Sequence, residues 1–341
     1  MQNRITAVDN LLDENGNLKQ VGYASELLLN YNRKDIKANK WRIKEWDYYL
    51  ISNKDFAIAL TIDDNSYMGL VSASFINLKE KWEKTVSKMF WFPNGKTNLP
   101  PSSKEGITIK EGKGYSCKFT TTKEKRVLEC SMDNFYNNNT YKVYFELTEE
   151  PKDSMVIATP FEKKKHFYYN QKIVGFKAVG KVEFDGKEYE FKDDTFALLD
   201  WGRGVWTYSN TWYWGAGYGM IGDELIGFNL GYGFGDTSKA SENMIFVNGE
   251  HIKLEDITFD IPKNKKGKDD FLSDWKIYSK DLSFNATFTP IINRHSNTNA
   301  LIIQSNQNQV FGNLNGTLNL KGKTITFKDF PCFFEKVINR W

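Results

Sequence analysis

Residues 211–236 read TWYWGAGYGMIGDELIGFNLGYGFGD, and the alternation of large side chains with glycines in this stretch decides the fold. A two-residue turn at Gly222-Asp223 would bring the two halves together as an antiparallel hairpin. The resulting pairs are Ile221 with Glu224, Met220 with Leu225, Gly219 with Ile226, Tyr218 with Gly227, Gly217 with Phe228, Ala216 with Asn229, Gly215 with Leu230, Trp214 with Gly231 and Trp212 with Gly233. Nearly every bulky side chain then lies over the bare backbone of a neighbouring glycine or alanine. A shift by one residue would oppose large side chains to large ones, so the stretch predicts this register for strands 211–220 and 225–234.

Alternation assigns the side chains of this hairpin to two faces, which we call the indole face and the phenyl face. The indole face carries Trp212, Trp214, Tyr218 and Met220, with Asn229 as its interior polar group. The phenyl face carries Ile226, Phe228, Leu230, Tyr232 and Phe234. Both faces are too apolar to contact water, so we expect a barrel in which one face lines the interior and the other packs on a second layer. The indole face is then either solid core or the wall of a cavity for an apolar, conjugated or ring-bearing ligand.

Short alternating runs with Gly, Asn and Asp turn signals continue on both sides of the hairpin and predict an all-β protein. Hairpin turns are expected at Asp185-Gly186, Asn248-Gly249, Asn315-Gly316 and Lys321-Gly322, with further strands at 141–150 and 282–290. Residues 76–91 have Leu78, Trp82 and Val86 about four apart, which fits either a helix or two charged strands. The pattern as a whole predicts antiparallel β-barrels or half-barrels with few short helices.

Length and composition bound the domain organisation. The chain has 341 residues, of which 40% are hydrophobic, 26% charged and 15% aromatic, as expected for a folded β-rich protein of one large or two medium domains. The basic run at 162–165 marks a break, after which turns come closer together. We therefore predict an N-terminal β domain at 1–165 and a C-terminal β domain at 166–341.

The same numbers exclude several classes of function. A net charge of +3 gives no basic footprint for nucleic acid, and no apolar run approaches the ~20 residues that a membrane span needs. Three cysteines without CxxC spacing and three dispersed histidines argue against a metal site, and GxGxxG and P-loop motifs are absent. The odd cysteine count and the lack of an apolar N-terminal segment favour a cytoplasmic location. The sequence makes no prediction about oligomeric state.

The stretch LLDWGRGVW at 198–206 packs an acid, a guanidinium and two indoles just before the hairpin, with Gly202 and Gly204 suggesting a tight turn. In one interpretation Asp200 and Arg203 pair and fix that turn. In the other, Asp200 is an acid whose pKa an apolar pocket raises, and the π-face of Trp201 or Trp206 stabilises the cation formed on protonation of a substrate.

The polar loop at 233–244 follows the hairpin and offers further candidates. Its Glu242 is a second candidate acid, and Glu242 or Asp236 is an alternative partner for Arg203. A loop at the mouth of a barrel is a common place for function, although a solvated turn has the same composition. Among the histidines only His166, which precedes three aromatic residues, is retained as a candidate contact. His251, which follows the Asn248-Gly249 turn, is expected to be exposed, and His295 is expected to lie in a loop.

Several of these motifs together resemble one known family. They are D-W-G-R-G-V-W (200–206), W-x-W (212–214), GFNLGYGFGDTS-x-A-x-EN (227–243), H-x-x-Y (166–169), GKVEFDG (180–186) and the C-terminal FFE…NRW (333–341). The chain resembles the bacterial DUF2804 family, for which the resemblance implies little biochemistry. It is more distantly similar to two-domain lipocalin-like (calycin) hydratases, cyclases and pericyclases, which implies paired barrels, terpenoid or polyene substrates, and acid catalysis by a carboxylate among aromatic side chains.

Three functions are compatible with these observations. The first is binding of an apolar small molecule, such as a lipid or isoprenoid, near the domain junction; its contacts would be Trp201, Trp206, Trp212, Trp214, Tyr218, Asn229, Tyr232 and His166. The second is a cofactor-independent hydratase, cyclase or isomerase that uses Asp200 or Glu242 as the acid, with Arg203 beside it. The third is a non-catalytic structural β module whose indole face is solid core. All three predict no metal, no cofactor and no nucleic-acid partner.

Overall fold

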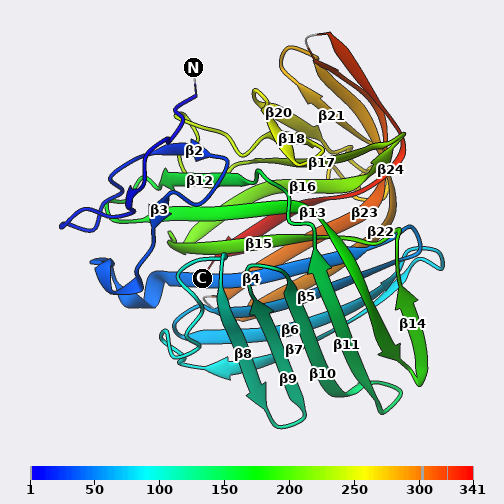
Figure 1. Ribbon diagram of the computed structural model, residues 1–341, viewed down its shortest axis with the longest axis horizontal. Helices are drawn as coiled ribbons and strands as arrows, with labels where there is room; N and C mark the ends of the chain where they lie inside the picture. Colours follow the sequence, from blue (N-terminus) through cyan, green and yellow to red (C-terminus); the bar gives the residue numbers. More distant parts are fainter. Residues whose placement is uncertain (1, 301–302, 321, 341) are drawn as a thin grey trace.

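A computed structural model describes residues 2–300, 303–320 and 322–340. Within these ranges the regular structure is β apart from two single-turn 3-10 helices, η1 (Arg33–Asp35) and η2 (Lys40–Arg42). Two strongly curled antiparallel sheets form two half-barrels (Figure 1). A short parallel pair, β1 (Asp9–Asn10) and β3 (Leu29–Asn30), lies near the N-terminus. The predicted fold class, two lipocalin-like half-barrels with few short helices, is confirmed.

The first sheet has thirteen strands. Ten of them lie in the order β7 (Trp82–Trp91), β6 (Met68–Asn77), β5 (Phe56–Asp64), β4 (Ile43–Ser52), β15 (Phe196–Val205), β13 (Phe167–Phe184), β11 (Asn139–Thr148), β10 (Arg126–Tyr136), β9 (Tyr115–Thr121) and β8 (Gly106–Gly112). The other three are β2 (Gly22–Ala24), β12 (Met155–Pro160) and β14 (Lys187–Phe191). Residues 76–91 thus belong to the hairpin β6–β7, so the helical alternative is wrong and the two-strand alternative is right.

The second sheet has nine strands. Their order is β19 (Glu250–Lys253), β18 (Met244–Val247), β17 (Glu224–Tyr232), β16 (Ser209–Ile221), β24 (Lys323–Arg340), β23 (Ile303–Leu320), β22 (Phe284–Ala300), β21 (Trp275–Ser279) and β20 (Ile257–Asp260). The chain passes from the first sheet to the second between Val205 and Ser209. The division into domains at residue 165 stays a prediction.

Three hydrophobic cores hold these layers together. One fills the first half-barrel and includes N-terminal residues such as Leu11 and Tyr31. A second fills the other half-barrel, around Phe228 and Phe334. The third joins residues of both sheets, such as Tyr48 of β4 and Trp214 of β16, and therefore lies between them. Contacts between β13 and β15 on one side and β16 and β17 on the other agree with this stacking (Figure 1).

The glycine-rich hairpin is β16–β17, and its predicted register is confirmed from the pair Ile221–Glu224 to the pair Trp214–Gly231. The phenyl face lines the second half-barrel, and the indole face packs toward the first sheet. The ladder ends at the pair Tyr213–Tyr232, so Trp212 and Gly233 are not paired.

The glycine after the hairpin changes the predicted faces in one detail. Gly233 has a φ of +88°, which turns the chain away from the strand direction. Phe234 therefore leaves the phenyl face, contrary to the prediction, and packs on the indole side with its ring centroid 5.2 Å from that of Trp212.

The predicted hairpin turns at Asp185-Gly186 and Asn248-Gly249 are confirmed, with positive φ at all four residues.

The predicted turn at Asn315-Gly316 is wrong. Strand β23 continues through these residues, with a register shift against β24 between Leu314 and Gly316. Gly316 is needed there because an added Cβ would lie 2.4 Å from Cα of Ala286 on the neighbouring strand. The dipeptide thus serves a close approach of two strands. Lys321, the first residue of the other predicted turn, lies outside the described residues, while β23 and β24 pair on either side of it.

Replacement of Gly215 by alanine is expected to lower the free energy of unfolding by about 1–3 kcal/mol, because an over-packed core must distort. A Cβ at Gly215 would lie 2.2 Å from the fully buried ring of Phe334. Gly219 of the same strand is the matched control, because its Cβ would meet nothing closer than 3.4 Å and should change stability by less than about 1 kcal/mol. Urea unfolding of both variants measures the difference, and equal losses would contradict this account of the register.

Candidate functional site

The polar groups between the two sheets begin with a cross-strand pair of the first sheet. Lys172 of β13 is opposite Asp200 of β15, and both side chains face the second sheet. The Nζ of Lys172 lies 2.8 Å from Oδ2 of Asp200, and Nδ2 of Asn170 donates a 2.6 Å hydrogen bond to Oδ1. All three side chains are buried, so the carboxylate of Asp200 is held by charge and hydrogen bonding rather than by water.

The second sheet places an indole and two carboxyl groups against this pair. The Nζ of Lys172 lies 3.7 Å from the ring centroid of Trp214, within cation–π distance. Trp214 Nε1 donates a 2.7 Å hydrogen bond to Oδ1 of Asn229, whose Nδ2 donates to the backbone oxygen of Glu242. Glu335 of β24 is the strand partner of Trp214. The buried asparagine of the indole face thus orients the indole that covers the lysine.

Side chains from the two neighbouring strands of its own sheet hold Glu335. Its Oε1 accepts a 2.9 Å hydrogen bond from Nε1 of Trp212. Its Oε2 lies 3.4 Å from Nε2 of Gln309, and Arg294 donates a 2.8 Å hydrogen bond to Oε1 of Gln309. One carboxyl group is therefore fixed by an indole and an amide, which leaves its protonation state free to change without loss of position.

We call Lys172, Asp200, Glu242 and Glu335 the acid cluster. Burial is the main cause that raises the pKa of Glu242 to about 7 and the pKa of Glu335 to about 7. For both groups Lys172 lowers the pKa and Asp200 raises it, so the four side chains act on one another electrostatically. Three carboxyl groups around one ammonium cannot all be ionised cheaply in a buried site, so two of them titrate near neutral pH.

Aromatic side chains surround the acid cluster. Burial raises the pKa of Tyr168 well above its usual value, and Glu242, Asp200 and Glu335 add to this shift, so the phenol lies near all three carboxyl groups. Its hydroxyl makes no hydrogen bond with the described residues, although the side chain is buried. Trp46 stacks on the Tyr168 ring at 6.2 Å, and Trp206 meets Trp46 edge-on at 5.2 Å.

The loop that carries Glu242 is tied down by the first residues of the chain. The backbone nitrogen of Ser241 donates a 2.8 Å hydrogen bond to Oε1 of Gln2, and the nitrogen of Asn3 donates a 2.7 Å bond to the oxygen of Lys239. Lys253 donates a 2.8 Å hydrogen bond to Oγ of Ser241, and burial lowers the pKa of this lysine to about 7. The position of Glu242 thus depends on the first residues of the chain as well as on Lys253 of its own sheet.

Arg203 and Trp201 lie on the other face of β15 and do not join the acid cluster. Gly202 and Gly204 are strand residues and form no turn, so Asp200 and Arg203, three positions apart, point to opposite sides. The predicted pairs of Arg203 with Asp200, Glu242 or Asp236 are therefore wrong.

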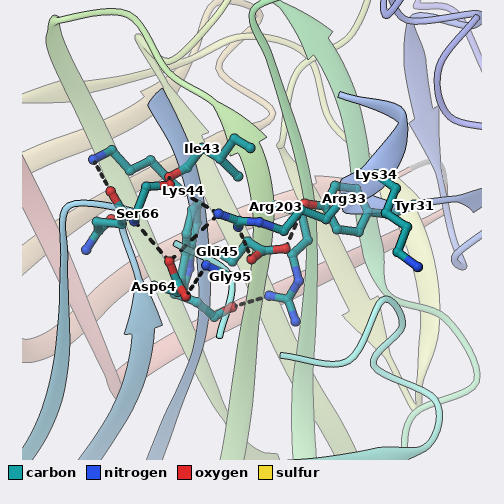
Figure 2. A network of polar contacts seen from close by, with 12 residues as sticks. Tyr31, Arg33, Lys34, Ile43, Lys44, Glu45, Asp64, Ser66, Gly95 and Arg203 are labelled. Carbon is teal, nitrogen blue, oxygen red and sulfur yellow. Dashed lines mark hydrogen bonds and ion pairs between the residues drawn. The ribbon is translucent and has the colours of Figure 1, made fainter. Parts of the chain in front are cut away.

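Arg203 instead contributes to a buried polar network in the first half-barrel. Its guanidinium lies 3.1 Å from Oδ1 of Asp47, donates to three backbone oxygens and stacks at 4.3 Å on the ring of Trp201. Figure 2 shows it beside Glu45, which accepts hydrogen bonds from Tyr31 and Arg33. This network ties the N-terminal segment to β4, and its charges are balanced locally.

Some of the remaining predicted site residues lie between the two sheets, and others lie elsewhere. Trp206, Trp212, Trp214, Tyr218 and Asn229 lie in or against the core between the sheets. Tyr232 lies on the phenyl face, where it stacks on Tyr213 at 4.6 Å. The Nδ1 of His166 lies 3.1 Å from the oxygen of Lys164, and burial lowers the pKa of His166. Tyr232 and His166 are therefore not brought to the acid cluster.

Two hollows open on the surface of the described structure. One of about 460 Å³ is lined by Lys152, Val247, Asn248, Glu250, His251 and Ile252. Another of about 230 Å³ is lined by residues of 17–21 and 160–167, with His166 among them. Neither is lined by the acid cluster, by Trp212 or by Trp214, so neither is the predicted cavity.

Lys172 and Glu335 are functional candidates that were not predicted from the sequence, although Glu335 lies in the C-terminal FFE motif. A signal for Lys172 exists: in FYYNQKIV (167–174) the positions Tyr168, Asn170 and Lys172 share one face of an expected strand. A signal for Glu335 exists in FFEKV (333–337), where alternation places it on the same face of an expected strand as Phe333 and Val337.

The fold and the cluster define a class of protein: a two-half-barrel, lipocalin-like β chain with ionisable groups buried among aromatic rings between its sheets. The model of the domain of unknown function DUF2804 matches residues 2–341, and the chain belongs to this family. No curated protein is significantly similar to it.

Three solved structures are similar to this chain, and the first of them shares its fold. An AttH-like protein of Nitrosomonas europaea is 8% identical, with a TM-score of 0.51 over 92% of this chain and 96% of that chain. Kievitone hydratase of Nectria haematococca is 11% identical, with a TM-score of 0.46 over 87% and 88%. CghA in complex with Sch210972 is 8% identical, with a TM-score of 0.46 over 98% and 97%. At these identities the likeness concerns the fold alone.

Two further searches of the described residues bear on the class of site. No three His, Cys, Asp or Glu side chains among them are grouped so that they could hold a metal ion. The described part of the chain also contains no helix long and apolar enough to cross a membrane.

Proposed function

We propose that the protein binds an apolar small molecule against the indole face, between the two sheets, and exchanges a proton with it through the acid cluster. The observation that carries this proposal is the pair of buried glutamates, Glu242 and Glu335, whose pKa values are raised to about 7 among aromatic rings. A protein that only stores a ligand has no need of these charges, and unpaired buried charges cost several kcal/mol.

The chemistry that this arrangement supports is general acid–base catalysis. A protonated Glu335 or Glu242 gives its proton to a double bond or carbonyl oxygen of the ligand. The carboxylate that remains is stabilised by Lys172, and the cation on the ligand is stabilised by the π-face of Trp214 or Trp206. The carboxylate then takes a proton back from the ligand or from attacking water. Isomerisation, cyclisation and hydration are all accessible by this route.

Trp212 is the residue through which the ligand would enter. It is only half-buried, whereas Trp214 behind it is buried. Its indole holds Glu335 by a hydrogen bond and packs edge-on against Trp206 at 5.7 Å. A movement of this one side chain would therefore open the aromatic wall and expose the carboxyl group at once.

Replacement of Trp212 by alanine tests the location of binding. With the neutral probe N-phenyl-1-naphthylamine, we expect saturable fluorescence enhancement by the native chain and at least about tenfold weaker binding by the variant, because a large aromatic contact is lost. Tyr213→Ala is the matched control, since Tyr213 is the next residue, is also half-buried and lies on the phenyl face. Equal effects of the two changes, or no binding by the native chain, would refute the proposal.

A second experiment separates catalysis from simple binding. Native mass spectrometry of the chain purified from its own host would reveal a retained ligand and its class. When that ligand is incubated in deuterated water, the native chain should introduce deuterium into the ligand. The double variant Glu335→Gln/Glu242→Gln should not. A ligand that is retained but never exchanges protons would leave binding alone as the function.

A further inference from the structure

The described surface gathers its exposed tryptophan and phenylalanine side chains at one place. Trp41, Trp91 and Phe92 are 48%, 62% and 62% exposed, and no other Trp or Phe within the described ranges is exposed. Met89 and Tyr208, at 57% and 48%, belong to the same region. We call these five residues the aromatic patch. Large apolar side chains that remain in water in one cluster mark an interaction surface.

Contacts between these side chains show that the patch is continuous. Trp41 of η2 meets Phe92 edge-on, with ring centroids 5.9 Å apart, and Trp91 lies 6.4 Å from Phe92. The guanidinium of Arg42 lies 5.8 Å from the ring of Tyr208. Segments 40–42, 89–92 and 208, distant in the sequence, thus form one surface.

The two segments that supply most of the patch are strongly basic. Residues 33–42 read RKDIKANKWR and residues 88–96 read KMFWFPNGK, with Asp35 as their only acid. Lys34, Lys37, Lys40 and Lys96 are exposed, and none of the four is in an ion pair with a described residue. The whole chain carries only +3, so this concentration of positive charge is local.

We propose that the aromatic patch docks the protein on the surface of a lipid bilayer that contains anionic lipids. Trp and Tyr rings favour the boundary between headgroups and acyl chains, and Phe and Met side chains gain by entering the apolar layer. Each lysine near an anionic surface adds about 1 kcal/mol of attraction. The inference stands on exposure and charge alone and does not depend on the proposed function.

Charge and ring geometry argue against two other occupants. A second copy of the chain would bring the same lysines face to face, because a twofold interface pairs each patch with itself. Single-stranded nucleic acid is bound by rings that stack in parallel on bases. Here Trp41 and Phe92 are at 89° and Trp91 and Phe92 at 43°, so no two rings form a platform.

The patch also adjoins the layer between the sheets. Nε of Arg42 donates a 3.1 Å hydrogen bond to the backbone oxygen of Trp206, whose ring packs on that of Trp212. An apolar molecule that leaves the bilayer at the patch would meet these indoles first.

Sedimentation of the full chain with vesicles tests the proposal. We expect binding to phosphatidylcholine vesicles with about 30 mol% phosphatidylglycerol, weak binding to phosphatidylcholine alone, and loss of binding at raised salt. Trp91→Ser/Phe92→Ser and, separately, Lys34→Glu/Lys37→Glu should each weaken binding by at least about tenfold. Circular dichroism of each variant confirms that it is folded.

Matched variants elsewhere on the surface test whether vesicle binding depends on the aromatic patch or on exposed apolar and basic side chains in general. Met220→Ser/Leu272→Ser removes two side chains of similar exposure, 51% and 61%, and Lys265→Glu/Lys266→Glu removes two exposed lysines of another loop. Both should bind anionic vesicles like the native chain. The proposal is overturned if the native chain ignores anionic vesicles or if the control pairs weaken binding as much. It is also overturned if Trp91→Ser/Phe92→Ser instead abolishes self-association in light scattering or binding of a single-stranded oligonucleotide.

Discussion

Replacement of Lys172 by methionine is expected to lower the free energy of unfolding by about 3–5 kcal/mol at neutral pH, because it leaves buried carboxylates without their cation. Lys172 is 2.8 Å from Asp200 and lowers the pKa of both Glu242 and Glu335. The loss should shrink as the pH falls toward about 5, because Glu242 and Glu335 then become protonated and no longer need the charge. Urea unfolding across this pH range measures the effect.

Asp200→Asn in the same chain should recover at least half of that loss, since removal of both partners leaves no uncompensated charge. The matched control is Lys142→Met, which breaks an exposed pair with Glu183 at 2.8 Å and should cost less than about 1 kcal/mol. If Lys172→Met costs no more than Lys142→Met, or if Asp200→Asn adds to the loss, then the electrostatic coupling described for the acid cluster is wrong.

Glu335→Gln is expected to stabilise the protein by about 1–3 kcal/mol near pH 8 and to leave it nearly unchanged near pH 5. The folded-state pKa of Glu335 is raised from 4.5 to about 7. A carboxyl group with a raised pKa contributes stability that is complete below the unfolded pKa and is lost as the pH rises through the folded one. Glutamine keeps an oxygen for the hydrogen bond from Trp212 and removes this loss.

Comparison of the native chain with the variant isolates this one group. Glu242, with a pKa of about 7, adds a loss of the same sign in the native chain. Burial lowers the pKa of Lys44 to about 7 and that of Lys253 to about 7, and these groups restore stability as the pH rises further. All three groups remain in the variant, so the difference between the two chains reports the removal of the Glu335 carboxyl group. Glu183→Gln, at an exposed site, should show no such pH dependence, and a constant loss for Glu335→Gln at both pH values would show that this carboxyl is ionised throughout.

The sequence specifies the hairpin β16–β17 because its register is a local property. Gly215 accommodates the ring of Phe334 and Gly217 that of Phe228, so a slip of the register would bring these rings against larger side chains. The same reasoning fails at Asn315-Gly316, where the dipeptide that usually marks a turn lies within a long strand and serves the close approach of Ala286. Dipeptide chemistry cannot distinguish these cases, because the distinction depends on a strand from another part of the chain.

Only part of the acid cluster could be predicted from the sequence, for a related reason. Asp200, Glu242 and the tryptophans lie in motifs dense enough to draw attention. Lys172 reaches Asp200, and Glu335 reaches Trp212, only because strands from different parts of the sequence pair within each sheet. The error over Arg203 has a simpler cause: Gly202 and Gly204 suggest a turn, yet the ring of Trp46 lies directly over Gly202 in a continuous strand. Once that strand is known, the alternation of side chains places Arg203 and Asp200 on opposite faces of it, because they are three positions apart.

The tie between Gln2 and Ser241 has a consequence for synthesis at the ribosome. These residues are separated by 239 positions, so the earliest part of the chain waits for most of the rest to emerge before it finds its partner. Until then Gln2 and Asn3 have no partners in the second sheet, and the segment that bears Glu242 lacks its hydrogen bonds to them. The charged centre of the molecule, which also needs Glu335 of the last strand, can be completed only after nearly the whole chain has been synthesised, and long-range pairing of this kind slows folding.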